Sequence, residues 1–274
     1  MADKTGAEYE IFALRYAWRD AKRSDHFIGG DPHDGPMPMD YFTWVIKGSG
    51  SEGGRTIVVD TGFTAEVSAK RGRQHLRCPI ETLAELGIDS DSVEDVVLTH
   101  LHYDHVGNFH KFAKARFHLQ TREMGFVTGP YMRYPKFGHS FEVEDVVGMV
   151  KLNFKGRLEQ HNGDFELAPN ITLHHVGGHT PGLQIVRVMT KRGWVVLASD
   201  ASHYYEHMQK NRFFTQAFNL GDMVDGYRTC ERLAASPDHI IPGHDPLVMK
   251  LYPAVSPKLE GVIVRLDVPP KKAG

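Results

Sequence analysis

The sequence of 274 residues has few cysteines, no long apolar run and little net charge. Its only cysteines are Cys78 and Cys230, too few for a disulfide framework, which indicates a reducing compartment. No apolar run approaches the roughly 20 residues needed to span a bilayer. The opening stretch, "MADKTGAEYE", lacks the basic and apolar regions of a secretory signal. Together these absences predict a soluble protein of the cytoplasm.

The charge balance excludes further classes of partner. The formal net charge is −2 at pH 7, and Lys and Arg are spread along the chain, so nothing favours a nucleic-acid or membrane-surface partner. The length suits one large α/β domain or two small ones. Because there is no internal repeat, we expect one domain over residues 1–274. We also expect a long loop at 19–40 near the functional site and a frayed tail at 265–274.

What the sequence does contain is a series of short runs rich in β-branched and aromatic residues, which predict strands. Most of these runs end at Gly or at a polar residue. The predicted strands lie within residues 10–18, 41–48, 55–62, 93–100, 170–182, 193–200, 238–246 and 261–268. One helix is predicted at residues 78–88, where a proline near the start precedes apolar residues at helical spacing.

Four of the predicted strands lead directly into polar side chains that can bind a metal. The stretch "VLTHLHYDHVGN" places three histidines and an aspartate within six positions, and three later strand ends each add one more such residue. In chain order the candidates are His100, His102, Asp104, His105, His179, Asp200 and His244. Because open sheets build their binding crevice at the carboxyl ends of strands, we expect these side chains to converge.

The residue types predict a metal site made of two half-sites. His100 and His102 are two positions apart, so they share a face in extended backbone, whereas Asp104 and His105 point to a neighbouring spot. Imidazole and carboxylate are ligands that Zn²⁺ prefers, although Mn, Co and Fe also bind such sets. The remaining candidates for closing the two half-sites are His179, Asp200 and His244.

Such a pair of metals would support hydrolysis. Two metals roughly 3.5–4 Å apart share a water and lower its pKa towards neutrality, which yields a hydroxide nucleophile at physiological pH. One metal also polarises a carbonyl, and the two oxygens of Asp200 suit a bridge between the ions. The pattern therefore predicts hydrolysis of an acyl or phosphoryl bond and not redox chemistry, since Zn²⁺ has no redox step.

The motif "HLHYDH" resembles the HxHxDH signature of the metallo-β-lactamase superfamily. The later stretches "GGHTPG", "ASDAS" and "IPGHDP" follow in the superfamily's order, so the resemblance extends from about Tyr41 to Pro246. It implies an α/β fold, the αββα sandwich, with the metals between the sheet edges. It also implies that Asp60 orients ligand histidines. The ligand sets it implies are His100, His102 and His179 for one zinc, Asp104, His105 and His244 for the other, and Asp200 as the bridge.

Within this superfamily the chain resembles the N-acyl-homoserine lactonase group most. The stretches "MDYFTWVI", "ARFHLQTREMGFVTGP" and "GHDPLV" carry this resemblance, together with the length. It implies a dinuclear zinc hydrolase that opens an N-acyl-homoserine lactone or a related small lactone, as in quorum quenching, and it suggests a homodimer. Asp104 and Asp200 would then be catalytic, with Asp200 or water protonating the leaving oxygen.

One position departs from the group's pattern. The group commonly has a Tyr three residues after the bridging Asp, but here that position is His203, followed by Tyr204. Either His203 donates a hydrogen bond to the substrate or Tyr204 replaces the missing phenol, so both are candidate catalytic residues. Met37 and Met39 are either anchors of the loop or walls of the substrate pocket. In the second case the other side of the pocket would be lined by Phe126, Tyr131 and Phe137.

Other functions on the same fold fit the sequence less well. A glyoxalase-II-type thioesterase shares the ligands and is the leading alternative, but it generally has a basic helical C-terminal extension that is absent after His244. Nucleic-acid-processing members need a large extra domain and a basic surface. Diiron oxidoreductases usually have Glu at the position of His102, and a non-catalytic binding protein should have lost ligands.

Overall fold

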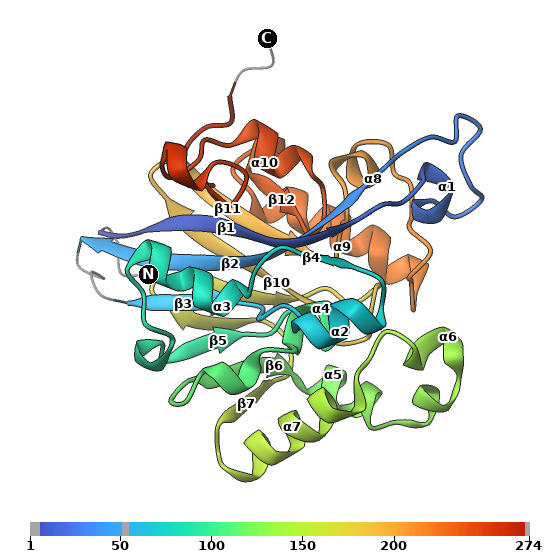
Figure 1. Ribbon diagram of the computed structural model, residues 1–274, viewed down its shortest axis with the longest axis horizontal. Coiled ribbons are helices and arrows are strands. Elements are labelled where there is room, and N and C mark those ends of the chain that lie inside the picture. Colours follow the sequence, from blue (N-terminus) through green and yellow to red (C-terminus); the bar gives the residue numbers. More distant parts are fainter. Residues whose placement is uncertain (1–5, 51–54, 272–274) are drawn as a thin grey trace.

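The structure, a computed structural model, describes residues 6–50 and 55–271. Within these residues the chain forms two sheets that pack face to face, with helices on both outer sides (Figure 1). The last residues of the predicted frayed tail, 272–274, lie outside the described residues.

The first sheet is mixed and contains the motif strand. In the described chain it has eight strands in the order β13-β1-β2-β3-β5-β6-β7, with β4 paired to β1. Strands β3, β5, β6 and β7 are parallel, and the other pairs are antiparallel. The strands are β1 (Ala7–Arg19), β2 (Met39–Gly50), β3 (Thr56–Val59), β4 (Gln74–His75), β5 (Asp95–Val97), β6 (Arg116–Gln120), β7 (Leu158–His161) and β13 (Ile263–Arg265).

The second sheet supplies the remaining strand ends of interest. Its order is β12-β11-β10-β9-β8, and only β11 and β12 form a parallel pair among the described residues. The strands are β8 (Phe165–Ala168), β9 (Ile171–His175), β10 (Gln184–Thr190), β11 (Gly193–Ser199) and β12 (Ile240–Pro242). Since β9 and β11 are both antiparallel to β10, the strands β9, β11 and β12 all end at the same edge.

The helices are short except for two. The α-helices are α1 (Arg23–His26), α2 (Ala65–Lys70), α3 (Pro79–Thr82), α4 (Tyr103–Val106), α5 (Thr121–Val127), α6 (Pro135–Gly138), α7 (Val143–Phe154), α8 (Tyr205–Gln209), α9 (Leu220–Leu233) and α10 (Leu247–Leu251). The 3-10 helices are η1 (Leu83–Leu86), η2 (Ser90–Ser92), η3 (Phe109–Lys111), η4 (Pro130–Arg133), η5 (Pro237–His239) and η6 (Pro257–Leu259). None of the helices in the described ranges is both long and apolar enough to cross a membrane.

Side-chain alternation along the strands sorts the core into layers. In β1, Ile11 packs between the two sheets, while the next residue, Phe12, faces the outer layer that contains residues of α3 and α7. In β11, Leu197 packs between the sheets, while Val196 faces the outer layer that contains α9. Since neighbouring residues of a strand point to opposite faces, each sheet carries one apolar layer on each side. The order helix, sheet, sheet, helix confirms the predicted αββα sandwich.

Two segments differ from the sequence prediction. The helix predicted at 78–88 is present as α3 followed by η1. The frayed tail predicted at 265–274 is wrong for its first part, because Leu266 is fully buried and its amide donates to the Ile11 carbonyl at 2.8 Å. Further on, the amide of Lys271 donates to Leu251 at 2.6 Å. Apolar contact with β1 therefore holds this segment on the first sheet.

Candidate metal centre

The seven candidate ligands all follow strand ends. His100 and His102 lie directly after β5 in the first sheet, and α4 then carries Asp104 and His105. The second sheet supplies His179 in the loop after β9, Asp200 directly after β11, and His244 after β12. All seven side chains are buried. The two sheets thus both contribute to one cluster, and the predicted convergence of the strand ends is present.

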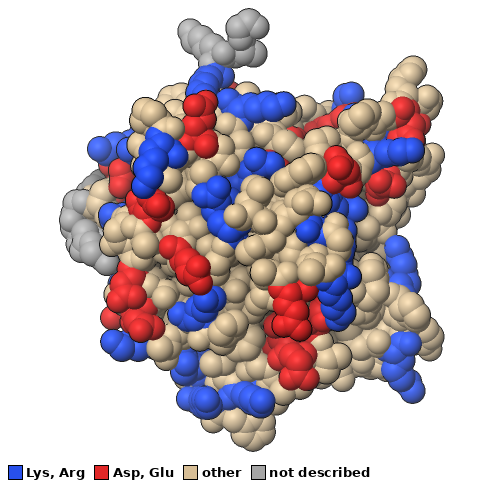
Figure 2. All heavy atoms as spheres, viewed as in Figure 1, with Lys and Arg blue, Asp and Glu red and all other residues tan. Residues whose placement is uncertain are grey.

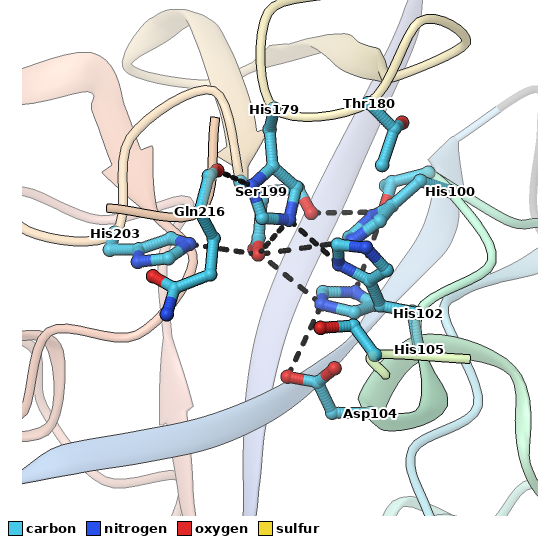
Figure 3. A network of polar contacts seen from close by, with 12 residues as sticks. His100, His102, Asp104, His105, His179, Thr180, Ser199, His203 and Gln216 are labelled. Atoms are coloured by element: carbon cyan, nitrogen blue, oxygen red, sulfur yellow. Dashed lines mark hydrogen bonds and ion pairs between the residues drawn. The ribbon is translucent and has the colours of Figure 1, made fainter. Parts of the chain in front are cut away.

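Candidate ligands from the motif and from the His179 loop converge in Figure 3. The ligand atoms form two groups joined by the carboxylate of Asp200, and His203 makes a further possible group with Asp200 and His244. The Oδ2 atom of Asp200 lies 3.1 Å from His179 Nε2 and 3.9 Å from His100 Nε2. Its Oδ1 atom lies 3.0 Å from His244 Nε2 and 3.5 Å from His105 Nε2. Within each of the two groups the ligand atoms all lie within 4.8 Å of one another. The groups are His100, His102, His179 and Asp200, and Asp104, His105 and His244.

The outer nitrogens of the histidines are fixed by acceptors. His105 Nδ1 lies 2.7 Å from Asp60 Oδ2, which is the contact predicted for Asp60. His244 Nδ1 donates to the Asp40 carbonyl at 2.8 Å, and His179 Nδ1 donates to the Gln216 carbonyl at 2.6 Å. Such bonds to the outer nitrogen set the tautomer and the ring orientation that a metal-binding histidine needs.

Two inner nitrogens of the cluster lack partners. The buried Nε2 atoms of His100 and His105 have no hydrogen-bond partner. A buried polar atom without a partner costs roughly 1–3 kcal/mol, so two in one place are unusual. Divalent cations, one in each group of ligands, would satisfy these atoms. The residues present therefore fit the metal centre that the sequence predicts.

Two histidines of the cluster are already in the form that binds a cation, whereas His105 would first have to release a proton. Burial lowers the pKa of His100 and of His102 well below the usual value, which leaves both rings neutral, the form that binds metals. Burial also lowers the pKa of His105. The neighbouring carboxylates, Asp60 first among them, outweigh the effect of burial and raise the pKa of His105 to about 10. Burial of Asp200 is outweighed by the surrounding histidines, which hold the pKa of this carboxyl well below its usual value.

The backbone around the cluster is held in uncommon conformations. Ser199, directly before Asp200, has a φ of 45°, and Asp60 has a φ of 60°. Residues other than glycine rarely adopt such angles, which cluster at functional sites. A Cβ on Gly243, beside His244, would lie 2.7 Å from Asp200 Oδ1. Only glycine lets the end of β12 approach the bridging carboxylate this closely.

Two buried polar residues that the sequence analysis missed support the ligand loops. Glu123 of α5 accepts from the Leu101 amide at 3.0 Å, and from the Thr180 hydroxyl and the Gly182 amide at 2.7 and 3.1 Å. One carboxylate thus ties the His100–His102 turn to the loop of His179. The hydroxyl of Thr99 lies 2.8 Å from Asp60 Oδ2 and 2.9 Å from Ser199 Oγ, linking both strained positions. No motif in the sequence distinguishes either residue.

His203 and Tyr204, the two candidates at the departing position, have different surroundings. His203 Nε2 lies 3.0 Å from Asp200 Oδ2, the ring stacks on Phe214 at a centroid distance of 3.7 Å, and its buried Nδ1 has no hydrogen-bond partner. The Tyr204 hydroxyl instead lies 3.0 Å from His26 Nε2 and does not line the cavity beside the metal ligands. The geometry therefore favours His203 over Tyr204 as the residue that reaches a substrate.

A cavity of about 280 Å³ opens beside the cluster. Of the residues expected in its wall, Met39 is present, whereas Met37 lines a different cavity. Phe126 and Phe137 line a narrow side pocket that also contains His102 and His179. Tyr131 packs against Phe137 at the edge of this aromatic group and is 45% exposed. The remaining residues lining the large cavity are Arg19, Tyr41, Arg71, Arg73, His102, Tyr103, Asp104, His139, Ser140, His179, Asp200, His203, Gln216 and His244.

Comparison with known proteins finds N-acyl homoserine lactonases among the relatives. The chain is 30% identical over 131 residues to an N-acyl homoserine lactonase of a Bacillus species, a match that covers 47% of either protein. It is 32% identical over 170 residues to the N-acyl homoserine lactonase AiiB of Agrobacterium fabrum, covering 54% of this chain and 59% of that protein. The chain thus spans about half the length of the curated relatives it matches.

Solved structures share the fold at lower sequence identity. A quorum-quenching N-acyl homoserine lactone lactonase has a TM-score of 0.71 at 18% identity, covering 87% of this chain and 92% of that one. AidC, a dizinc quorum-quenching lactonase, has a TM-score of 0.67 at 16% identity, covering 87% and 88%. Residues 38–249 match the metallo-beta-lactamase superfamily, and this range contains all seven candidate ligands. The protein therefore belongs to the metallo-beta-lactamase superfamily.

Proposed function

We propose that this protein is a metal-dependent hydrolase that opens the ring of a small lactone. The observation that carries the proposal is the place of Asp200, whose two oxygens face two separate groups of ligand atoms. The N-acyl homoserine lactonases among its relatives support an ester bond as the target. An N-acyl-homoserine lactone is one substrate of this class, and its hydrolysis would quench quorum signalling.

We expect the cluster to hold two Zn²⁺ ions, with Mn, Co or Fe as ions that the same ligands accept. The proposed ligands are His100, His102 and His179 for one ion, Asp104, His105 and His244 for the other, and Asp200 for both. Ions bound there would lower the pKa of a water and polarise the substrate carbonyl.

The residues around the cluster have separate tasks in the reaction. Water adds to the ring carbonyl carbon, the ring C–O bond breaks, and the product is a hydroxy acid. Asp104 Oδ2 lies 3.6 Å from His105 Nε2 and can orient the attacking water and accept its proton. The leaving ring oxygen takes up its proton from water, which Asp200 and His203, joined by the 3.0 Å contact, can orient. Both groups line the cavity beside the cluster, where a bound substrate would meet them.

Metal analysis and turnover of a lactone panel test the proposal. The Asp200→Asn and His105→Gln variants should lose at least about a hundredfold in kcat along with bound metal, because each removes a proposed ligand. Asp225→Asn, an exposed change on α9, is the matched control and should retain both. A variant that loses its metal yet keeps near-full turnover would disprove the metal-dependent mechanism.

The same panel distinguishes the alternative thioesterase. It should include lactones that differ in acyl-chain length and ring type, together with a glutathione thioester. Faster turnover of the thioester than of every lactone would reassign the site to a glyoxalase-II-type reaction. The proposed function requires the reverse order.

A further inference from the structure

Three arginines line the cavity beside the proposed metal ligands: Arg19, Arg71 and Arg73. One of them has a carboxylate partner, since Arg71 Nε donates to Glu142 at 2.8 Å and its guanidinium lies over the Tyr103 ring at 3.9 Å. Neither of the other two forms an ion pair with a carboxylate among the residues that the structure describes, although the charge of Asp104 acts on Arg73. The polar contact of Arg73 is to the Tyr103 hydroxyl at 3.0 Å, and the buried Nε of Arg19 has no hydrogen-bond partner.

The register of β1 and β4, continued by one residue, places Arg19 beside Arg73. In the antiparallel pair of β1 and β4, Ala17 lies opposite His75 and Trp18 opposite Gln74. The next step of this register sets Arg19 opposite Arg73, with both side chains on one face of the sheet. On its other side Arg19 pairs with Met39, another residue of the cavity wall. The two guanidinium groups therefore share the face that forms this wall.

Two like charges opposite each other on a sheet are unfavourable unless an anion separates them. The only acidic residues of the cavity wall are Asp104 and Asp200, and both belong to the proposed metal cluster. Two divalent ions would more than neutralise these two carboxylates. With both ions bound, the cavity would therefore contain an excess of positive charge next to the reaction centre.

This basic character is local to the cavity. The face of the molecule in Figure 2 shows Lys and Arg mixed with Asp and Glu, and the formal net charge of the whole chain is −2. An arginine pair inside a cavity on such a molecule is suited to a bound anion, because guanidinium groups form charge-assisted bonds with planar carboxylates.

We propose that Arg19 and Arg73 bind an anionic group, foremost a carboxylate, carried by the substrate at a distance from the bond that is hydrolysed. This inference rests on the proposed hydrolase function and narrows its substrate to lactones or related cyclic esters that bear a negative charge. The two arginines are specificity-determining residues and do not take part in the bond-breaking step.

The test compares two γ-butyrolactones, one carrying a carboxylate on the γ carbon and the other the corresponding carboxamide. The metal-loaded wild type should favour the carboxylate by about tenfold in kcat/KM, a difference equivalent to one charge-assisted contact. Arg19→Gln and Arg73→Gln should each raise KM for the carboxylate about tenfold and leave kcat/KM for the carboxamide within about twofold. Arg73→Lys, which keeps the charge, should retain part of the preference.

Arg228→Gln is the matched control, because it removes a positive charge from the exposed face of α9, away from the cavity. It should leave the preference unchanged. A second readout is calorimetric binding of cyclopentanone carboxylate, whose ring cannot be opened, to the metal-loaded protein. Both glutamine variants should bind this probe about tenfold more weakly than the wild type and the control.

Three outcomes would overturn the inference. They are a wild type without preference for the carboxylate, glutamine variants that bind the probe normally, and an equal loss of kcat for both lactones, which would place the arginines at the reacting carbonyl. A different result would contradict only the proposed lactonase function. In that case the metal-loaded wild type would open none of the lactones tested but would still bind the probe through the two arginines, and the anion site would stand.

Discussion

Glu123 holds the loops that carry the proposed metal ligands but is not a ligand itself. A substitution of Glu123 therefore tests how much this support contributes to metal binding. Its carboxylate accepts three hydrogen bonds, one from the His100–His102 turn and two from the loop that follows His179. Glu123→Gln should keep the shape but replace an acceptor oxygen with an NH₂ group. Because partners that hold ligand loops matter nearly as much as the ligands, we expect metal affinity to fall by about 10–100-fold.

Titration of the apoprotein with zinc, followed by competition with a chelator, measures this loss. Glu144→Gln on the exposed side of α7 removes the same charge far from the loops and should not change the affinity. If Glu123→Gln binds zinc as tightly as the wild type, the carboxylate does not position the ligand loops.

At the scale of residues, the sequence predicts the groups that belong to a spaced motif and not those that act singly. His100 and His102 stand out because their spacing is that of a ligand pair. Glu123 stands in a short amphipathic helix like any surface glutamate, and only the fold turns it inward to meet Thr180. The sequence does not predict a role for Arg19 either. Its position beside Arg73 follows only from the pairing of β1 with β4.

The elements α1 and α8 are joined by buried histidines. His26 of α1 lies 2.9 Å from the Met37 carbonyl and 3.0 Å from the Tyr204 hydroxyl, and His207 of α8 lies 3.1 Å from the His26 carbonyl. Burial lowers the pKa of His26 to about 4 and that of His207 to about 3. Both rings are therefore neutral in the folded protein at neutral pH.

These lowered pKa values predict a loss of stability in mild acid. A histidine in the unfolded chain takes up a proton below about pH 6.5, whereas folded His26 does so only near pH 4. Between these values the unfolded state binds more protons, so the free energy of unfolding falls as the pH falls. His26 alone should contribute a loss of about 2 kcal/mol between pH 7 and pH 5.

Urea unfolding of wild type and His26→Gln across this range measures the difference. The glutamine Nε2 can replace the donor to Met37, but it does not titrate, so the variant should lose less stability on acidification. His33→Gln, an exposed change in the same loop, should follow the wild type. Parallel curves for all three proteins would refute the role of His26.

At the scale of elements, the strands are more predictable than the segments between them. The alternation of apolar residues in β1 and β11 fixes their buried faces, and strand positions follow from composition. The segment at 19–40 contains α1 and a bridge between Lys22 and Pro36, held by contacts to α8 that local sequence does not encode. The same limit applies to the tail, where Leu266 is ordered by β1.

On the scale of the whole molecule, the proposed metal ligands connect the two sheets. His100, His102 and His105 extend from the first sheet, and His179, Asp200 and His244 extend from the second. Because no ligand set is complete within one sheet, binding requires the sandwich to be assembled. The resemblance of the motifs to a known superfamily predicts this arrangement, whereas strand propensity alone would leave the packing of the sheets open.

Removal of the metals should therefore weaken the entire fold and not one loop. A ligand that binds only the folded state stabilises it by about 4 kcal/mol at a thousandfold excess over Kd, which for a chain of this size corresponds to roughly 10 °C in Tm. Calorimetry with and without a chelator should show one cooperative transition that moves down by this amount and returns when zinc is restored. In Asp200→Asn, which lacks the shared ligand, the chelator should change Tm by only a small fraction of this shift. A wild-type Tm that is indifferent to the chelator, with metal loss verified, would mean that the two sheets hold together without the ions and that the cluster does not couple them.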